Sequence, residues 1–120
     1  MNDNEKLEAF LKTQTHMVIA VTCDDGTPWS VPVKVQNYNG RDFEWDSKVD
    51  TFHSIALEQH SRISITMFSR DTDPFGQFGF YAVGNAVKLI DKDHGVARYA
   101  FSVERAWIND HTFVKREVEI

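Results

Sequence analysis

The sequence predicts a mainly β (α+β) domain in which six strands form a small antiparallel barrel with short flanking helices. Short segments of apolar runs or of apolar–polar alternation recur along the 120 residues. Turn sequences separate them, as at Asp24–Pro28 and at Asn37–Gly40, which contains the Asn-Gly hairpin signal. Parallel neighbours need long crossover connections, so these short connections favour a barrel over a doubly wound parallel sheet.

The N-terminal half begins with a short amphipathic helix over Asn4–Lys12. Met17–Val21 is a continuous apolar run, typical of a buried strand. Trp29–Gln36 alternates between apolar and polar residues, with Pro32 indicating an edge or irregular position. The alternation continues through Phe43 and Trp45, so we expect a three-strand meander here.

The C-terminal half alternates between helical and strand patterns. The predicted elements are a helix over Thr51–Gln59, a strand over Arg62–Phe68, a loop over Ser69–Gln77, a long strand over Phe78–Leu89, a second helix over Asp93–Val103 and a last strand over Thr112–Ile120. Gly79 and Gly84 indicate a bulge or a close backbone approach in the long strand. Arg116 shares a strand face with Val114 and Val118, and a buried arginine usually needs a partner, so we expect it either to pair across an interface or to bind a ligand.

Length, charge and cysteine content limit the classes of function that this chain can have. The length fits one domain, residues 1–120. A net charge of −5 and a pI near 5.4 argue against a nucleic-acid surface. The single cysteine, Cys23, cannot form an internal disulfide, and no segment has the pattern of a signal peptide or a membrane span. We therefore expect a cytoplasmic protein without a membrane partner.

The stretch from Phe43 to Ser54 carries the strongest functional signal, because a strand runs directly into a helix there. Backbone N–H groups in the first turn of a helix have no partner within it and attract anions, phosphate above all. Ser47, Thr51 and Ser54 add hydroxyl groups at this junction. The alternative is that these hydroxyls only cap the helix, and that the neighbouring Lys48 is a solvated surface side chain.

The order of elements resembles the FMN-binding split barrel of the pyridoxamine 5'-phosphate oxidase-like family. The segments that carry the resemblance are the Gly-Pro turn, the strand Trp29–Lys34, the strand ending in hydroxyl residues, the helix, the strand Arg62–Ile65 and the Gly-containing strand Ala82–Ala86. The resemblance implies a six-stranded antiparallel split β-barrel with short flanking helices, homodimeric, with flavin at the subunit interface. It also implies that Trp107 reaches the partner's flavin ring.

By this resemblance, the ring is lined by strand residues and the phosphate is held at the helix start. His53 stands where many members have a lysine, and a neutral imidazole gives one hydrogen bond where an ammonium gives full charge. The implied FMN-binding residues are Trp29, Val31, Pro32, Val33, Lys34, Asp46, Ser47, Thr51, Phe52, His53 and Ser54.

The resemblance implies an FMN-dependent oxidoreductase of unknown small-molecule substrate that needs no catalytic side chain, with the loop Ser69–Gln77 as a lid. A true pyridoxamine phosphate oxidase is not expected, because the C-terminal Arg-x-His pair of those enzymes has no counterpart after Trp107. The alternative is a binding or stress-response module that holds flavin, haem or deazaflavin without turnover. We expect no metal site, since His53 and His60 on one helix face lack a third ligand.

Overall fold

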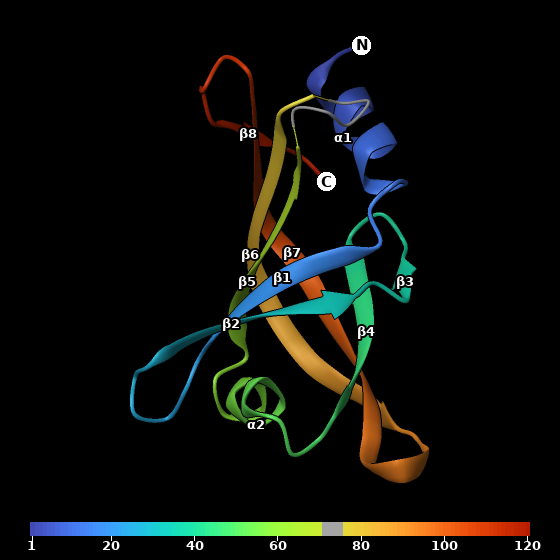
Figure 1. The fold of residues 1–120 in the computed structure, drawn as a ribbon, viewed down its shortest axis with the longest axis vertical. Helices are drawn as coiled ribbons and strands as arrows, with labels where there is room; N and C mark the ends of the chain where they lie inside the picture. Colours follow the sequence, from blue (N-terminus) through green and yellow to red (C-terminus); the bar gives the residue numbers. More distant parts are fainter. Residues whose placement is uncertain (71–75) are drawn as a thin grey trace.

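The structure, a computed structural model, describes residues 1–70 and 76–120 (Figure 1). Its elements are α1 (Asp3–Leu11), β1 (His16–Thr22), β2 (Pro28–Lys34), β3 (Asn37–Tyr38), β4 (Asp42–Lys48), α2 (Phe52–Gln59), β5 (Arg62–Ser69), β6 (Phe78–Asp91), the 3-10 turn η1 (Asp93–Gly95), β7 (Val96–Asp110) and β8 (Arg116–Val118). Both helices of the N-terminal two thirds of the chain therefore lie where the sequence predicts them. The predicted lid falls largely on residues 71–75, outside the described residues.

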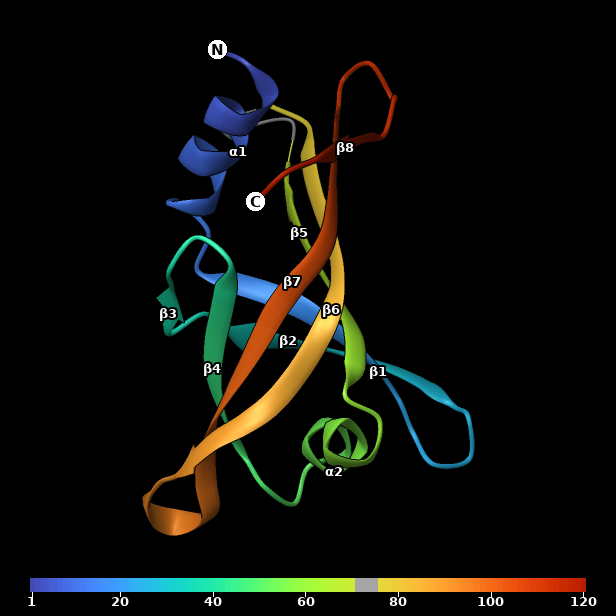
Figure 2. The ribbon, with the colours of Figure 1, turned by 180° about the vertical axis from the view of Figure 1, so that it is seen from behind.

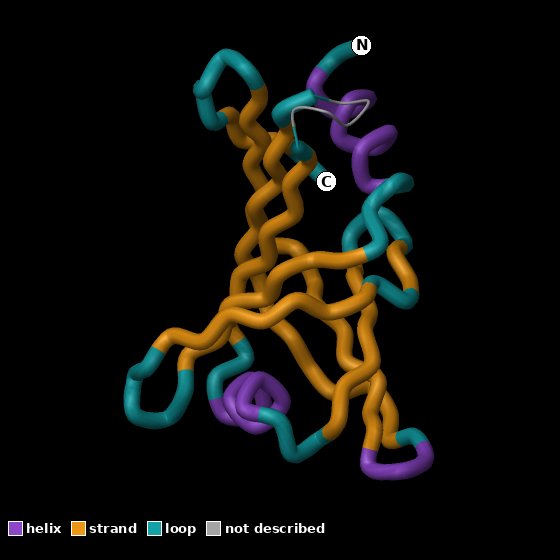
Figure 3. The backbone as a smooth tube through the Cα atoms, in the orientation of Figure 1, coloured by secondary structure: helices purple, strands orange, loops and turns teal. Residues whose placement is uncertain are grey.

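All strands belong to one antiparallel sheet, whose order is β2-β1-β5-β6-β7-β4-β3, with β8 added on β7 (Figure 3). The described residues thus contain eight strands, and the expected number of six was wrong. Two of the extra strands are too short to give a periodic pattern, since β3 has two residues and β8 has three. The position of Pro32 is as expected, because β2 is an edge strand that, within the described part of the chain, pairs only with β1.

The sheet curls until its two ends meet, which closes the barrel. The backbone N–H of Gln36, just after β2, donates to the carbonyl oxygen of Glu44 in β4 at 2.8 Å. The two views of the ribbon show the end of β2 reaching β4 at this point (Figures 1 and 2). The predicted three-strand meander was wrong, because β4 forms its ladder with β7 and β3 and meets the end of β2 only at this closure.

The segment predicted as a second helix is mostly strand. Only Asp93–Gly95 forms a 3-10 turn, after which β7 begins at Val96. The apolar residues used for the prediction fit a helical period, but Ala97, Tyr99 and Phe101 alternate at period two and are fully buried. Pairing with β4 on one side and β6 on the other decides between the two patterns, as tertiary context often does.

The core fills the inside of the curled sheet, and α1 and α2 lie near opposite ends of it (Figures 1 and 2). Its largest fully buried side chains are Trp45, Tyr99, Phe10, Phe43, Phe80 and Phe101. α1 contributes Leu7, Phe10 and Leu11, and α2 contributes Ala56 and Leu57. Because α2 covers one end of the barrel, its first turn is held against the last residues of β4.

Gly84 permits the long strand to bend. The register between β6 and β7 shifts between Val83 and Gly84, which is the irregularity expected from the sequence. A Cβ atom at Gly84 would overlap the backbone carbonyl of Ser102 on β7. Only glycine therefore lets the two strands approach this closely.

Candidate functional site

The candidate site lies where β4 ends and α2 begins. Thr51 is the N-cap of α2, with an extended backbone and a side-chain oxygen that accepts a hydrogen bond from the N–H of Ser54 at 3.2 Å. Such a cap satisfies one of the free amides of the first helical turn. The N–H groups of Phe52 and His53 have no hydrogen-bond partner among the described residues. These two amides are available to an anion, with the partial positive charge of the helix end behind them.

Four polar side chains meet at this helix start, and we call them the α2 cluster: Ser47, Thr51, His53 and Ser54. The Nε2 atom of His53 lies 3.0 Å from the Oγ of Ser47 and 3.3 Å from the Oγ1 of Thr51. The hydroxyls of Thr51 and Ser54 are 2.8 Å apart. His53 is 8% exposed and Ser54 is 1% exposed. The structure thus brings together the four residues predicted for the phosphate, and it also shows the capping bond of the alternative interpretation.

Burial lowers the pKa of His53 below its ordinary value. The imidazole is therefore neutral near pH 7 and brings no positive charge to the cluster. Its Nδ1 atom has no hydrogen-bond partner among the described residues. The α2 cluster, taken with the free amides, is a set of neutral hydrogen-bond donors and one titratable group.

Asp46, predicted to contact a flavin ring, is instead engaged in ion pairs. Its carboxylate accepts hydrogen bonds from Arg98 on β7 and from Lys92, the latter at 2.9 Å. Hydrogen bonds from Arg98 hold the pKa of Asp46 below its usual range. Arg98 and Lys92 could not be predicted as partners of Asp46, because the pairing of β4 with β7 places Arg98 opposite Asp46, and Lys92 lies shortly before β7. A ring contact from Asp46 stays a prediction.

The predicted ring-binding strand approaches the cluster through its aromatic end. Trp29 at the start of β2 meets Phe52 edge-on, with ring centroids 5.2 Å apart and planes at 81°. Both rings reach solvent, Trp29 at 41% and Phe52 at 65% exposure. Further along β2, Val31 and Val33 point toward the core, whereas Pro32 and Lys34 are exposed. Lys34 lies five residues from Trp29, roughly 17 Å along the strand, and has no described contact with the α2 cluster.

An apolar hollow of about 130 Å³ lies along the exposed side of α2, next to this aromatic pair. It is lined by Cys23, Asp24, Phe52, Ile55, Ala56 and Gln59. Pockets that hold ligands of flavin size usually have a volume of roughly 300 Å³ or more. Next to the α2 cluster, one copy of the chain therefore offers an open aromatic surface and not an enclosed pocket for a large ring.

A second hollow lies away from this site, on the outer side of β1, β2 and β5. It has a volume of about 320 Å³ and a mainly apolar lining that includes Met17, Val18, Pro32 and Phe68. His16 lies at this hollow, and its Nδ1 atom is 2.9 Å from the hydroxyl of Thr15. No hydrogen bond to the Nε2 atom of His16 occurs among the described residues.

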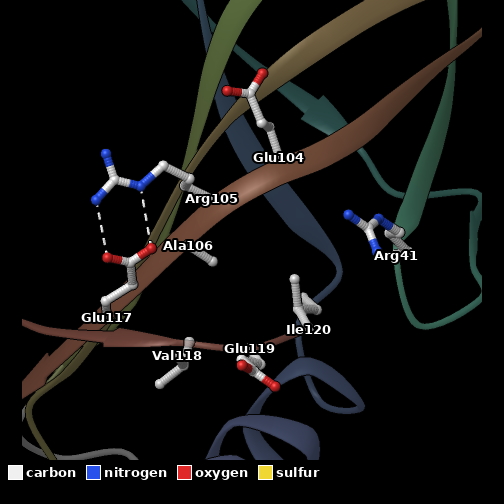
Figure 4. A pocket seen from close by; sticks show the side chains of 8 residues that line it. All are labelled: Arg41, Glu104, Arg105, Ala106, Glu117, Val118, Glu119 and Ile120. Carbon is white, nitrogen blue, oxygen red and sulfur yellow. Dashed lines mark hydrogen bonds and ion pairs between the residues drawn. The ribbon is translucent and has the colours of Figure 1, made fainter.

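A third cavity, of about 270 Å³, lies where β7 and β8 meet the start of β4 (Figure 4). Figure 4 shows Arg41 on one side of the cavity and Arg105 on the other. Arg105 is bound to Glu117 at 2.8 and 3.0 Å and stacks over the ring of Trp107 at 4.9 Å. Charged groups of both signs line this cavity, so it presents no field of a single sign to a ligand.

The described residues contain no set of three or more His, Cys, Asp or Glu side chains arranged to hold a metal ion. None of the helices formed by residues 1–70 and 76–120 has the length and apolar character needed to cross a bilayer.

No known family profile matches the sequence, and no curated protein matches it either. Solved structures do match the fold. One is a haem-binding protein from Mycobacterium smegmatis, with a TM-score of 0.81 and 14% identity over 98% of this chain. Another is a protein from Clostridium acetobutylicum that is related to general stress protein 26 of B. subtilis and belongs to the pyridoxinephosphate oxidase family. It matches with a TM-score of 0.78 and 13% identity over 100% of this chain and 97% of that chain. The chain spans only 58% of the length of the M. smegmatis protein.

A third match is a pyridoxamine 5'-phosphate oxidase-related, FMN-binding protein from Nostoc punctiforme (TM-score 0.73, 5% identity, 98% of this chain and 94% of that chain). The chain has the fold of the pyridoxamine 5'-phosphate oxidase-like split barrels. The resemblance drawn from the sequence is thereby confirmed at the level of the fold. Proteins of this fold include a flavin binder and a haem binder, so the fold alone does not identify the ligand of this chain.

Proposed function

We propose that this split barrel binds FMN, with the phosphate at the α2 cluster and the ring along the aromatic end of β2. The observation that carries the proposal is the meeting of Ser47, Thr51 and His53 at a helix start whose first two amides have no protein partner. A phosphate dianion accepts hydrogen bonds from hydroxyls and amides of this kind. The FMN-binding protein from Nostoc punctiforme, which has this fold, supports the choice of flavin.

The donor set fits a phosphate, and the aromatic surface fits a planar ring. Ser47 and Thr51 would donate to phosphate oxygens, the amides of Phe52 and His53 would complete the cradle, and Trp29 would flank the ring. A bound flavin supplies one-electron or hydride chemistry, for which the protein contributes binding, orientation and electrostatics. Ion pairing of Asp46 with Arg98 keeps that carboxylate from repelling the phosphate at full strength.

A second copy of the chain is part of the proposal, because one copy leaves the ring surface open. Trp29, Phe52 and Ile55 are 41%, 65% and 48% exposed, and the hollow beside them is smaller than a flavin ring requires. Exposed aromatic residues next to a ligand site are typical of an interface. On this proposal the partner chain forms the other wall of the ring site.

Absorbance and titration test the proposal. Purified protein should be yellow, or should bind added FMN with quenching of flavin fluorescence and a rise in melting temperature. Bleaching of the bound flavin by reduced nicotinamide would establish an oxidoreductase, whereas a reduced flavin that forms only with dithionite would favour the non-catalytic module. A protein that neither quenches FMN fluorescence nor gains thermal stability from it would refute flavin binding.

Haem is the second candidate, and the geometry at His16 favours it. With Nδ1 of His16 held by Thr15, the Nε2 atom is left as a metal ligand beside an apolar hollow. The haem-binding protein from Mycobacterium smegmatis has the same fold. Haem titration of the wild type and of His16→Ala separates this candidate, since a Soret shift that survives the substitution would exclude His16 as the ligand.

A further inference from the structure

His53 is the one titratable group in the α2 cluster, and binding of an anion determines which of its ring nitrogens donates a hydrogen bond and which accepts one. In the neutral ring, Nε2 either donates to the Ser47 hydroxyl or accepts from it, since a neutral imidazole has one donor and one acceptor nitrogen. A phosphate dianion only accepts, so Ser47 and Thr51 must turn their single hydroxyl protons toward it. The Nε2 atom must then donate to Ser47, which leaves Nδ1 as the acceptor and the site for a proton.

Burial is the dominant influence on His53 in the absence of an anion. Several charged groups on the surrounding elements are paired with one another: Asp46 of β4 with Arg98 and Lys92, Lys88 of β6 with Glu58 of α2 at 3.6 Å, and His60 after α2 with Asp24 after β1 at 3.1 Å. The other charged or titratable groups on these elements are Cys23 after β1, Lys34 of β2, and Lys48 and Asp50 in or just after the end of β4. Among the described residues, none of them forms a hydrogen bond or an ion pair with His53. Desolvation alone therefore lowers the pKa of His53, with no nearby charge to offset it.

A dianion at the α2 cluster would reverse this balance. Two negative charges next to the imidazole favour its protonated form, because an opposite charge within about 4–6 Å stabilises a cation. The proton would sit on Nδ1, and Nε2–H would remain bonded to Ser47, so protonation does not disturb the bond between His53 and Ser47. His53 would thereby become positively charged only when the negatively charged phosphate is bound next to it.

We propose that binding of a phosphate dianion at the α2 cluster is coupled to uptake of one proton by His53. This inference rests on the proposed function. It makes His53 the residue that sets the pH range of flavin binding. By linkage, affinity rises as pH falls through the pKa that His53 has in the complex and declines above it. Below pH 6, approximately, the phosphate itself takes up a proton, which limits the effect on the acid side.

Calorimetric titration with FMN at pH 7.5, in two buffers of different ionisation enthalpy, measures the proton uptake. The wild type should take up between about 0.3 and 1 proton per FMN, and its affinity should fall by up to about tenfold per pH unit between pH 7 and 8.5. His53→Gln keeps an amide donor but cannot titrate, so it should show no proton uptake from this site. Riboflavin, which lacks the phosphate, should show none with either protein.

Equal proton uptake and equal pH dependence in the wild type and His53→Gln would overturn the inference while leaving FMN binding intact. Failure of FMN to bind at any pH would instead refute the proposed function. Should His53→Gln not fold, NMR titration of the wild-type His53 ring with and without FMN gives the same decision. A pKa that FMN raises supports the coupling, and one that FMN leaves unchanged contradicts it.

Discussion

The Nε2 atom of His53 lies 3.0 Å from the Oγ of Ser47, which joins the first turn of α2 to the end of β4. The two residues are six positions apart, and the turn between them carries Thr51, which caps the helix. Capping and anion binding are therefore not exclusive here, because the side-chain bond to the Ser54 amide leaves the amides of Phe52 and His53 free. The arrangement orders the donors before any ligand arrives, which lowers the entropic cost of binding.

Asp110 should stabilise the protein at neutral pH and lose this contribution in acid. Its carboxylate accepts hydrogen bonds from Arg116 at 3.0 Å and from Thr112 at 2.7 and 3.0 Å, and Arg116 also binds Asp3 of α1. These bonds hold the pKa of Asp110 far below its usual range. A lowered folded-state pKa means that the stabilisation is present above about pH 4, the unfolded value, and is lost as pH falls further.

The substitution Asp110→Asn should accordingly lower the unfolding free energy at pH 7 by about 1.5–3 kcal/mol. It should also flatten the decline in stability between pH 4 and pH 2. Urea unfolding at several pH values measures both effects. Asp25→Asn, at an exposed carboxylate whose pKa is lowered only by local bonds in its own turn, is the control and should change stability at pH 7 much less. Identical acid profiles for Asp110→Asn and the wild type would contradict this account.

Tyr99 carries a buried hydroxyl that has no hydrogen-bond partner within residues 1–70 and 76–120. It stacks on Trp45 with centroids 5.9 Å apart, and neither the Tyr99 hydroxyl nor the Trp45 indole nitrogen has a hydrogen-bond partner in the described structure. Tyr99→Phe removes an unsatisfied polar group and should raise the unfolding free energy by about 1 kcal/mol.

Tyr81→Phe is the matched control for Tyr99→Phe. The Tyr81 hydroxyl donates to Asn109 at 3.1 Å, so its loss should lower the unfolding free energy by about 0.5–1.5 kcal/mol. Thermal or urea denaturation of the two variants gives the comparison. Equal destabilisation by both substitutions would mean that the Tyr99 hydroxyl does have a partner.

Gly84 should not tolerate a side chain. Because a Cβ atom would meet the backbone of Ser102 and not a flexible side chain, Gly84→Ala should destabilise the protein by at least about 1–3 kcal/mol. Asn85→Ala, at an exposed neighbour, should stay within about 0.5 kcal/mol of the wild type. A melting temperature for Gly84→Ala equal to that of Asn85→Ala would show that the strands do not approach closely here.

Local patterns were sufficient to predict those parts of the fold that local forces decide. The helices at residues 3–11 and 52–59 have caps and apolar faces that the sequence displays, and Pro32 and Gly84 have the edge and bulge positions that their backbone chemistry requires. Non-local pairing decided the rest. The segment after Gly95 satisfies both helical and strand periods, and only its neighbours β4 and β6 select the strand.

The candidate site divides in the same way. Ser47, Thr51, His53 and Ser54 lie within eight residues, so one turn brings them together and the sequence predicted them as a group. The partners of Asp46 and of Arg116 come from residues far away in the chain, Arg98 in one case and Asp3 in the other. Their identity depends on strand register and on the docking of α1, which no spacing rule reveals.

The affinity ratio of FMN to riboflavin tests the phosphate site most directly, because the two ligands share the ring and differ in the phosphate. Fluorescence titration of the wild type should give FMN at least about tenfold tighter binding, and Ser47→Ala should lose about ten- to a hundredfold in FMN affinity with riboflavin unchanged. Ser61→Ala, an exposed serine just beyond the other end of α2, should behave like the wild type. Equal affinity of the wild type for the two flavins, or an unchanged ratio in Ser47→Ala, would contradict a phosphate site at the start of α2.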